Sequence, residues 1–252
     1  MYSIGIDIGS TAAKAAVLED GHVVKTLVTP TGFNSVDASR RIEEQLAQEG
    51  IACEGSYVTA TGYGRVSVPF ADRVVTEITC HGRGAAFLFE RDGTVVDVGG
   101  QDTKVIAVVD GKVKKFLMND KCSAGTGRFL EVMADRMGVT QEELAALARE
   151  GEPVTISSMC TVFAESEVTS LVGNGVALPD IAGGVMESVV SKVATMVGQL
   201  SSDTYFLTGG LCENAYIVER LAARLGRPVE TKPLARYAGA LGAALLGAEA
   251  AG

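Results

Sequence analysis

The sequence contains no uninterrupted apolar run of about 18 residues, the length that a membrane-spanning helix needs. Its N-terminus lacks the basic segment and apolar core of a secretion signal. These two absences predict a cytoplasmic protein without a membrane partner. Basic residues are also in the minority, with 22 Lys and Arg against 31 Asp and Glu and a formal net charge of -9. Because phosphate backbones attract basic surfaces, nucleic acid is not the expected partner.

The cysteine pattern excludes several common sites. The chain has five cysteines but no C-x-x-C pair, so neither a zinc ribbon nor a bacterial ferredoxin motif is present. An odd number of cysteines without a secretion signal does not indicate a disulfide framework. The sequence also has no low-complexity linker. Any hinge between domains must therefore be short, and we expect hinges near residues 90–93 and near Pro233.

What the chain does contain is ample material for buried cores. With 252 residues, of which 47% are hydrophobic, it suits one large or two modest domains. Strand-like and helix-like segments alternate, and the pattern restarts at Thr94. Strands are predicted at residues 23–28 and 57–60, besides those of the hairpins below. Helices are predicted at residues 37–48, 85–89, 127–137, 141–148, 162–171, 180–200, 215–225 and 237–246.

Two stretches of the chain repeat one another at an offset of 90 residues. The first is Asp7-Ile-Gly-Ser-Thr-Ala-Ala-Lys14, and the second is Asp97-Val-Gly-Gly-Gln-Asp-Thr-Lys104. An Asp-Gly pair follows each of them at the same distance. Apolar residues flank each acid and follow each lysine. This pattern predicts two β-hairpins, each with a glycine-bearing first turn and a tight Asp-Gly second turn.

The first turn of each hairpin has the composition of a phosphate site. Glycine lets backbone N–H groups approach an anion closely. An acid at the end of a buried strand instead repels bare phosphate and needs a cation between them. A single hairpin of this kind is more often an ordinary structural element, but a second copy in the same register favours a magnesium nucleotide held between two related halves.

A third segment, residues 204–214, has an apolar strand that ends in Gly209-Gly210 before a helix. A strand, a Gly-Gly turn and a helix also form a common structural unit. With the duplicated hairpins, however, the segment resembles the actin, Hsp70 and sugar-kinase superfamily, in which the matching turn lies against the adenosine. The resemblance implies an α/β fold with two actin-like domains around a nucleotide cleft, formed by residues 1–90 with 236–252 and by residues 91–235.

Cys122 and Cys160 are the informative cysteines. Cys122 precedes Ser-Ala-Gly-Thr-Gly and a helix, and Cys160 precedes another helix that Thr161 can cap. We expect both thiols near helix N-termini, where the dipole favours a thiolate metal ligand. Two ligands do not complete a four-cysteine iron–sulfur cluster, so a cluster requires a second copy of the chain. By spacing alone, small core residues are the stronger interpretation of both.

Two longer segments favour cluster ligands over core residues as the interpretation of these cysteines. Asn119-Asp-Lys-Cys-Ser-Ala-Gly-Thr-Gly-Arg-Phe-Leu130 and Ser157-Ser-Met-Cys-Thr-Val-Phe-Ala-Glu-Ser-Glu-Val168 closely resemble the activators of 2-hydroxyacyl-CoA dehydratases. These are ATP-dependent electron donors, grouped with the ATPase subunits of benzoyl-CoA reductase. The likeness covers nearly the whole chain. In that family the cysteines matching Cys122 and Cys160 bind one [4Fe-4S] cluster at a homodimer interface, so the resemblance implies ATP or ADP, Mg²⁺ and this cluster as cofactors.

The hairpins and the resemblance together give an expected role to each site residue. Asp7 and Asp97 hold Mg²⁺ through water, and Gln101 or Asp102 orients the attacking water. ATP binding closes the two domains and moves the helices that follow the cysteines. The residues expected to bind the nucleotide are Gly9, Ser10, Thr11, Lys14, Gly99, Gly100, Gly125, Gly127, Gly209, Gly210 and Asn214.

The implied partner is a 2-hydroxyacyl-CoA dehydratase. A benzoyl-CoA reductase and a double-cubane cluster protein are the alternatives, and ferredoxin or flavodoxin is the expected electron source. A small-metabolite kinase would need a catalytic base and a substrate pocket for which no segment is evident, and a chaperone-like ATPase would need no cluster. The sequence assigns no role to Cys212 or Arg236, where the chain departs from its relatives. At Cys80-His81 a packed thiol at a helix start is favoured over a metal site.

Overall fold

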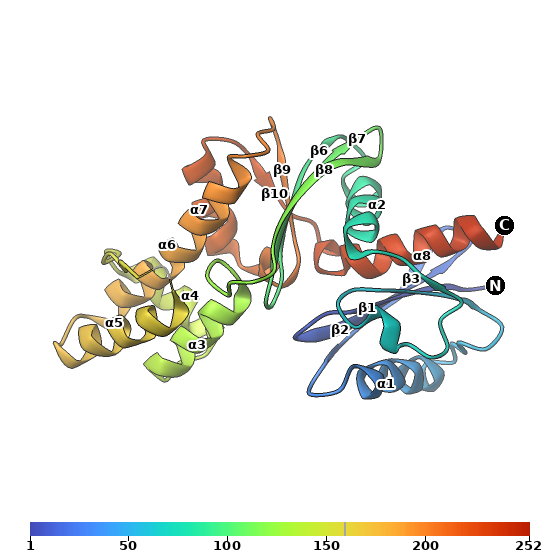
Figure 1. The fold of residues 1–252 in the computed structure, drawn as a ribbon, viewed down its shortest axis with the longest axis horizontal. Helices are drawn as coiled ribbons and strands as arrows, with labels where there is room; N and C mark the ends of the chain where they lie inside the picture. Colours follow the sequence, from blue (N-terminus) through green and yellow to red (C-terminus); the bar gives the residue numbers. More distant parts are fainter. Residues whose placement is uncertain (159) are drawn as a thin grey trace.

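The computed structural model describes residues 1–158 and 160–252; Met159, part of the second cysteine segment, lies outside the described residues. Within the described part of the chain two five-stranded sheets form, each built mostly from one half of the sequence (Figure 1). The first has the order β3-β2-β1-β4-β5 and the second β10-β9-β6-β7-β8. Their strands are β1 (Ser3–Ile8), β2 (Ala12–Glu19), β3 (His22–Pro30), β4 (Tyr57–Thr61), β5 (Arg73–Val74), β6 (Gly93–Val98), β7 (Thr103–Val109), β8 (Lys112–Asn119), β9 (Tyr205–Thr208) and β10 (Val229–Glu230).

The duplicated hairpins form as predicted. Asp7 pairs with Lys14 across β1 and β2, and Asp97 pairs with Lys104 across β6 and β7, in the same antiparallel register. The Asp-Gly turns adopt positive φ at both residues, with Asp110 at 51° and Gly111 at 68° in the second hairpin. Such angles suit the tight two-residue turns that match the twist of paired strands. In both sheets the first strand of the hairpin also pairs in parallel with a later strand, β4 or β9.

The helices are distributed unequally between the two halves. Helix α1 (Ser35–Gln48) covers the outer face of the first sheet, whereas several helices follow β8 in the second half (Figure 1). These are α3 (Gly127–Met137), α4 (Gln141–Glu150), α5 (Thr161–Gly173), α6 (Leu178–Val197) and α7 (Ala215–Leu225). Helices α3 and α7 have the predicted bounds, and the others differ by a few residues at their ends.

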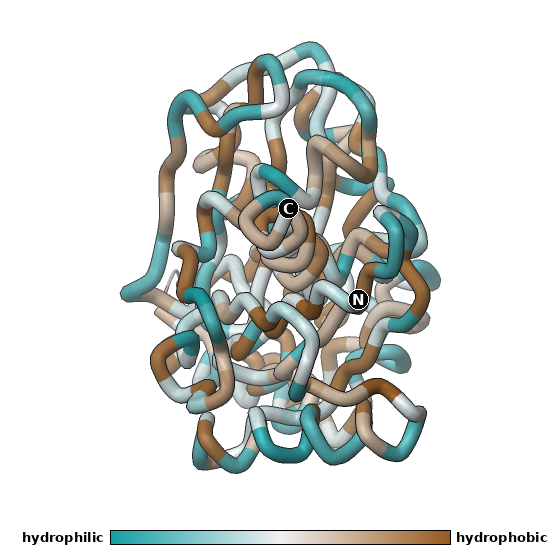
Figure 2. The backbone as a smooth tube through the Cα atoms, turned by 90° about the vertical axis from the view of Figure 1, so that its right-hand side faces the viewer, coloured by the Kyte–Doolittle hydropathy of each residue, from teal (hydrophilic) through white to brown (hydrophobic). Residues whose placement is uncertain are grey.

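Two helices, α2 (Glu77–Phe89) and α8 (Ala238–Ala251), pack on each other between the sheets. Figure 2 looks along the apolar α8 from its C-terminal end and shows it in the middle of the molecule. A Cβ at Gly84 of α2 would overlap the Ala238 carbonyl. The sequence prediction began α2 too late, at residue 85, because its glycines resemble helix breakers, whereas here they permit close packing of α8.

The apolar cores follow this arrangement. One cluster joins the second sheet to α3, α4, α6 and α7, another joins the first sheet to α1, and a third lies around α2 and α8. The third cluster includes Leu18 from the first sheet and Ile106 from the second. The two sheets are therefore bridged by buried apolar contacts. None of the helices in residues 1–158 and 160–252 has both the length and the apolar character needed to cross a bilayer.

Candidate functional site

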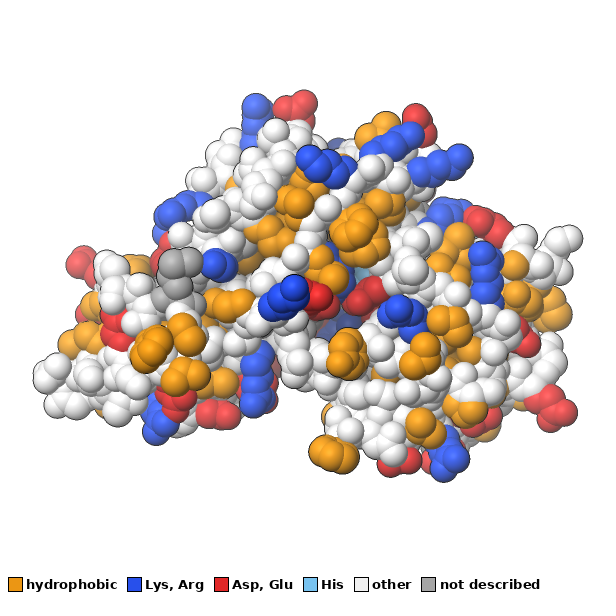
Figure 3. Space-filling view, viewed as in Figure 1, with side chains coloured by type: hydrophobic (Ala, Val, Ile, Leu, Met, Phe, Trp, Pro, Cys, Tyr) orange, Lys and Arg blue, Asp and Glu red, His pale blue; other side chains and the backbone are white. Residues whose placement is uncertain are grey.

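A cleft of about 430 Å³ lies between the two sheets. Figure 3 shows acidic and basic side chains gathered in this hollow between the halves. The first turns of the two hairpins meet across it, since a Cβ at Gly100 would overlap the Thr11 hydroxyl. Of the residues predicted to bind or process nucleotide, the cleft is lined by Asp7, Gly9, Ser10, Thr11, Lys14, Asp97, Gly99, Gly100, Gln101, Asp102, Gly127, Gly209 and Gly210.

Two of the residues predicted to bind nucleotide have other surroundings. The Gly125 carbonyl accepts a hydrogen bond from the Thr103 hydroxyl, and Gly125 lines a different depression beside α6. The Asn214 side chain caps α7 by accepting a hydrogen bond from the Ile217 amide. Gly125 and Asn214 do not line the cleft and each makes a structural contact elsewhere, so this geometry does not support a role for them as nucleotide ligands.

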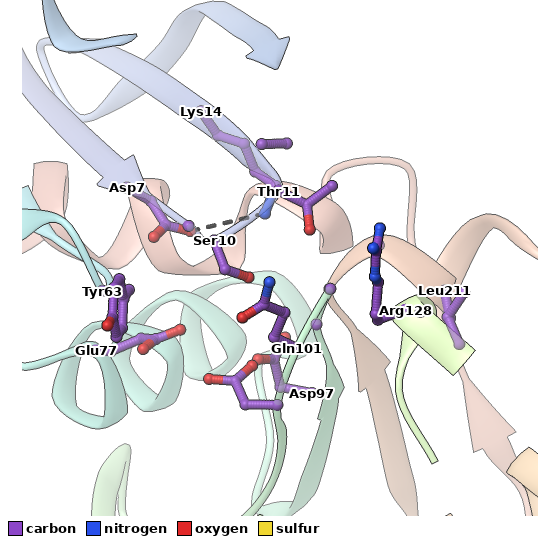
Figure 4. A pocket seen from close by; sticks show the side chains of 18 of the residues that line it. Asp7, Ser10, Thr11, Lys14, Tyr63, Glu77, Asp97, Gln101, Arg128 and Leu211 are labelled. Atoms are coloured by element: carbon purple, nitrogen blue, oxygen red, sulfur yellow. Dashed lines mark ion pairs between the residues drawn. The ribbon is translucent and has the colours of Figure 1, made fainter. Parts of the chain in front are cut away.

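The first aspartate stands at the end of β1 with few partners. Asp7 is buried, and its Oδ2 lies 3.8 Å from Lys14 Nζ, as drawn in Figure 4. Its Oδ1 has no hydrogen-bond partner among the described residues. A buried carboxylate oxygen without a donor is costly unless a cation or ordered water contacts it. Asp7 therefore has the chemistry of a cation ligand.

The second aspartate is in the opposite situation. Asp97 Oδ1 lies 3.2 Å from His81 Nε2 and accepts a hydrogen bond from Thr208 Oγ1 at 3.0 Å. Its Oδ2 lies 3.2 Å from Lys104 Nζ. Burial alone would raise the pKa of Asp97, but the charges of His81 and Lys104 outweigh it and hold this pKa well below its usual range. Asp97 is consequently a fully ionised and well-paired carboxylate.

Lys104 is the centre of a buried charge network that sequence reasoning missed. Its ammonium contacts Glu77 and Asp102, each at 2.8 Å, in addition to Asp97. Burial opposes its charge, yet the three carboxylates raise the pKa of Lys104. Burial and the Lys104 charge oppose protonation of His81, but Asp97 and, less strongly, Glu77 outweigh them and raise the pKa of His81 to about 9. The sequence repeat could have identified Lys104 as a site residue, because Lys104 occupies the position in the second hairpin that Lys14 has in the first.

Further cleft residues were also absent from the predicted set. Arg128 is the second residue of α3 and points into the cleft opposite the first hairpin (Figure 4). Arg236, which the sequence left without a role, lies at the rim and pairs with Glu213 at 2.8 Å. The remaining residues of this kind are Ala12, Tyr63, Arg65, Met118, Asp120, Glu131, Gln141 and Leu211. The position of Arg128, next to a glycine at a helix start, is typical of anion sites and could have been found from sequence.

Cys122 and Cys160 lie together on an exposed face. Both side chains are exposed, and the hydroxyls of the residues after them, Ser123 and Thr161, are 2.8 Å apart. Cys160 itself is the N-cap residue of α5, so the predicted Thr161 cap is wrong. Cys160 therefore lies at a helix start, as expected, whereas Cys122 lies in the loop between β8 and Thr126, the N-cap of α3. The prediction that both are core residues is excluded by their exposure.

The other cysteines differ from this pair. Burial raises the pKa of Cys53 to about 11, of Cys80 to about 12 and of Cys212 to about 11. These side chains therefore stay protonated near neutral pH and are poor metal ligands, since thiolates bind metals. Cys80 packs within α2 as predicted. His81 does not merely pack there, because it contacts Asp97 in the cleft.

The segment that follows Cys122, from Gly125 to the first residues of α3, is hydrogen bonded to the second hairpin at its phosphate turn and at Thr103. The Gly127 amide donates to the Gly99 carbonyl at 2.9 Å, and the Arg128 amide donates to the Gly100 carbonyl at 2.8 Å. The Thr103 hydroxyl holds the Gly125 carbonyl at 2.8 Å. A displacement of this turn would therefore be transmitted to the loop that carries Cys122.

Comparison with known proteins identifies the family. The chain is 44% identical to the activator of lactoyl-CoA dehydratase from Anaerotignum propionicum over 100% of this chain and 99% of the relative. It matches the solved structure of the activator of 2-hydroxyisocaproyl-CoA dehydratase from Clostridium difficile with bound ADPNP, at a TM-score of 0.93 and 38% identity, covering 100% of this chain and 96% of that one.

A more distant likeness confirms the predicted fold class. A ROK family glucokinase from Streptomyces griseus superimposes with a TM-score of 0.64 over 99% of this chain and 100% of that chain, at 15% identity. This match concerns the fold alone, which is the two-sheet plan of the sugar-kinase superfamily. The model of the BadF/BadG/BcrA/BcrD ATPase family, in turn, matches residues 4–247. The chain therefore belongs to the BadF/BadG/BcrA/BcrD ATPase family.

Proposed function

We propose that this protein is an ATP-hydrolysing iron–sulfur electron donor that activates a 2-hydroxyacyl-CoA dehydratase. The names of its relatives support the dehydratase as partner. The observation that carries the proposal is the set of hydrogen bonds that join Gly99, Gly100 and Thr103 of the second hairpin to residues 125–128, which follow Cys122 in the chain. They make a nucleotide site and a thiol site parts of one structural unit, as an ATP-driven electron donor requires.

The cleft fits the phosphates of ATP or ADP. The glycine-bearing turns at Ser10-Thr11 and Gly99-Gly100 present backbone amides, and Lys14 and Arg128 supply positive charge. Oδ1 of Asp7, which has no hydrogen-bond partner in the described part of the chain, fits a magnesium ion, either directly or through its bound water. The adenosine would lie near Gly209-Gly210, at the rim where Arg236 stands.

Gln101 is the residue that orients the attacking water. Both Gln101 and Asp102 lie on the second phosphate turn, and the sequence left the choice between them open. Asp102 Oδ2 is held by Lys104 at 2.8 Å, whereas Gln101 is exposed and points into the cleft (Figure 4). A residue that positions water must be free to face it, because phosphoryl transfer depends mainly on positioning and electrostatics.

The exposed thiols of Cys122 and Cys160 fit a shared iron–sulfur cluster. They lie on adjacent segments joined by the Ser123–Thr161 hydrogen bond, and neither is buried. A [4Fe-4S] cluster, when bound, supplies one-electron chemistry at low potential, and four thiolates hold it. A homodimer brings the two further cysteines. The apolar side chains of Val162 and Phe163, exposed beside Cys160, support contact with a second copy.

Domain closure couples the two sites. The predicted division places residues 1–90 with 236–252 in one domain and 91–235 in the other, with the phosphate turns facing each other between them. A γ-phosphate bound by both turns draws them together. Because α3 starts on the Gly99-Gly100 turn, the loop of Cys122 follows that movement. A double-cubane protein or benzoyl-CoA reductase remains the alternative partner, with ferredoxin or flavodoxin as electron source.

The test measures how the cluster responds to nucleotide. Anaerobic protein is compared without nucleotide, with ADP and with ATP, by the EPR signal of its reduced form and by the rate of iron release to a chelator. We expect ATP to change both quantities more than ADP does. An unchanged spectrum and release rate in all three states would contradict the proposal.

Removing one hydrogen bond between the hairpin and the loop of Cys122 tests whether the cluster loses its response to ATP while the cluster itself stays bound. Thr103→Val keeps the shape of a buried side chain but deletes its hydrogen bond to the loop. We expect this variant to keep its iron and its nucleotide affinity while losing most of the ATP response. Thr195→Val is the matched control, because that hydroxyl bonds only to the Ser191 carbonyl within α6.

A further inference from the structure

The two aspartates of the repeat are equivalent in sequence and in register but not in their contacts. Asp7 lies opposite Thr61 across the parallel pair β1 and β4, and Asp97 lies opposite Thr208 across β6 and β9. The Thr208 hydroxyl donates to Asp97, whereas the Thr61 hydroxyl makes no such bond to Asp7. The hairpin geometry therefore does not impose one shared role on the two carboxylates.

The lysine of the second hairpin is more buried than the lysine of the first and, like its aspartate, has more charged partners. The Lys14 side chain is 12% exposed and has one carboxylate at 3.8 Å, while that of Lys104 is 1% exposed and has three within 3.2 Å. One carboxylate at that distance leaves Lys14 able to bind a phosphate oxygen. Lys104 has no such freedom, since its ammonium, which has three protons to donate, already contacts three carboxylates.

The carboxylates around Lys104 resemble a cation site. Ligand atoms of Glu77, His81 and Asp97 lie within 4.8 Å of one another, a spacing that could hold a metal ion. The ammonium of Lys104 contacts both carboxylates of this group and Asp102 as well. A divalent ion at the same place would lie against a buried positive charge. The lysine therefore takes the place that a metal would otherwise occupy.

We propose that Lys104 is a built-in counter-cation that withdraws Asp97 from metal binding, so that Asp7 is the carboxylate that holds the magnesium ion of the nucleotide. This inference rests on the proposed nucleotide site and deepens it. It revises the sequence expectation that both aspartates share the ion. His81 and Lys104 are positioning residues, because both fix the carboxylate of Asp97. Lys104 also ties the phosphate turn to α2 through its contacts with Asp102 and Glu77.

The first experiment replaces each aspartate by its amide. Mn²⁺ substitutes for Mg²⁺, and the EPR signal of free Mn²⁺ in the presence of ADP reports how tightly the ion binds the full-length protein. We expect Asp7→Asn to weaken Mn²⁺ binding about tenfold or more, because a charged ligand is lost. Asp97→Asn should change it less than about twofold. Equal losses, or a larger loss for Asp97→Asn, would overturn the inference.

The second experiment removes the counter-cation. Lys104→Ala leaves Glu77, Asp97 and Asp102 without their shared partner, and we expect this variant to bind an additional Mn²⁺ ion without nucleotide. Lys104→Arg keeps the charge and Lys14→Ala removes the equivalent lysine, so neither should gain an ion. If Lys104→Ala unfolds in buffer, Mn²⁺ should restore its folding. If Lys104→Ala neither binds an additional Mn²⁺ ion nor becomes more stable with Mn²⁺, the inference is overturned. This outcome decides the matter even if the Asp97→Asn variant of the first experiment does not fold.

These outcomes separate the inference from the proposed function. The Mn²⁺ measurements need neither an iron–sulfur cluster nor a partner enzyme. Failure of the unmodified chain to bind ADP at all would overturn the proposed function and the inference together. Binding of ADP with Mn²⁺ held equally by both aspartates would overturn the inference alone.

Discussion

The connection after the third strand of the hairpin sheet is where the two halves of the molecule differ most. Within the described residues, the first half has α1 between β3 and β4, whereas the second has α3, α4, α5 and α6 between β8 and β9. The inserted helices bring both exposed cysteines, and α3 begins on the second phosphate turn. The comparison shows that the shared hairpins build the cleft and that the insertion adds a second site attached to one side of it.

The largest expected effect concerns the cysteines of the insertion. Cys122→Ser and Cys160→Ser should each abolish the iron of anaerobically prepared protein, because a serine hydroxyl is a poor replacement for a thiolate ligand. Cys53→Ser changes a cysteine of the first half and should leave the iron content near four per dimer. Iron analysis and the visible spectrum measure the difference. Full iron content in Cys122→Ser or Cys160→Ser would remove the cluster from the insertion.

An intermediate effect is expected where the two halves meet. In Gly100→Ala the new methyl group overlaps Thr11 of the opposite turn. Overpacking of this kind costs about 1–3 kcal/mol, so ATP should bind on the order of tenfold more weakly, as measured by calorimetry. The iron content should not change. Gly173→Ala is the control, since among the described residues its added Cβ meets nothing within 4 Å apart from its chain neighbours and the nearby backbone of α5. Equal ATP affinities in the two variants would mean that the two turns need not approach each other.

The smallest expected effect lies within the insertion. Ser123→Ala removes the hydrogen bond to Thr161 that joins the two cysteine segments. Such a bond contributes about 0.5–1.5 kcal/mol, so urea unfolding should shift by that amount and iron should be released faster to a chelator. Ser170→Ala deletes a hydroxyl that bonds only within α5 and should affect neither quantity. If iron is released faster from both variants, the stability of α5 as a whole, and not the Ser123–Thr161 hydrogen bond, controls iron release.

Local pattern was sufficient for the hairpins, for the bounds of α3 and α7 and for the lining of most of the cleft. These features depend on residues that are close in the chain, such as the alternation around Asp7 and the turn at Asp110-Gly111. The sequence pattern mispredicted the start of α2, because glycines in a sequence usually indicate the end of a helix. In the structure the glycines of α2 instead let α8 pack closely against it. The pattern also failed at Thr161, where a hydroxyl that could cap the helix bonds to Ser123 of a distant segment instead.

The sequence by itself therefore determined the duplicated fold, the family and the two pairs of Asp and Lys. Only the tertiary structure decided that the pairs differ. His81 and Glu77 reach the second pair from α2, and Thr208 reaches it from β9, whereas no comparable group contacts Oδ1 of Asp7 among the described residues. The physical reason is that the charge state and partners of a buried carboxylate depend on neighbours in space, and those neighbours come from segments far apart in the chain.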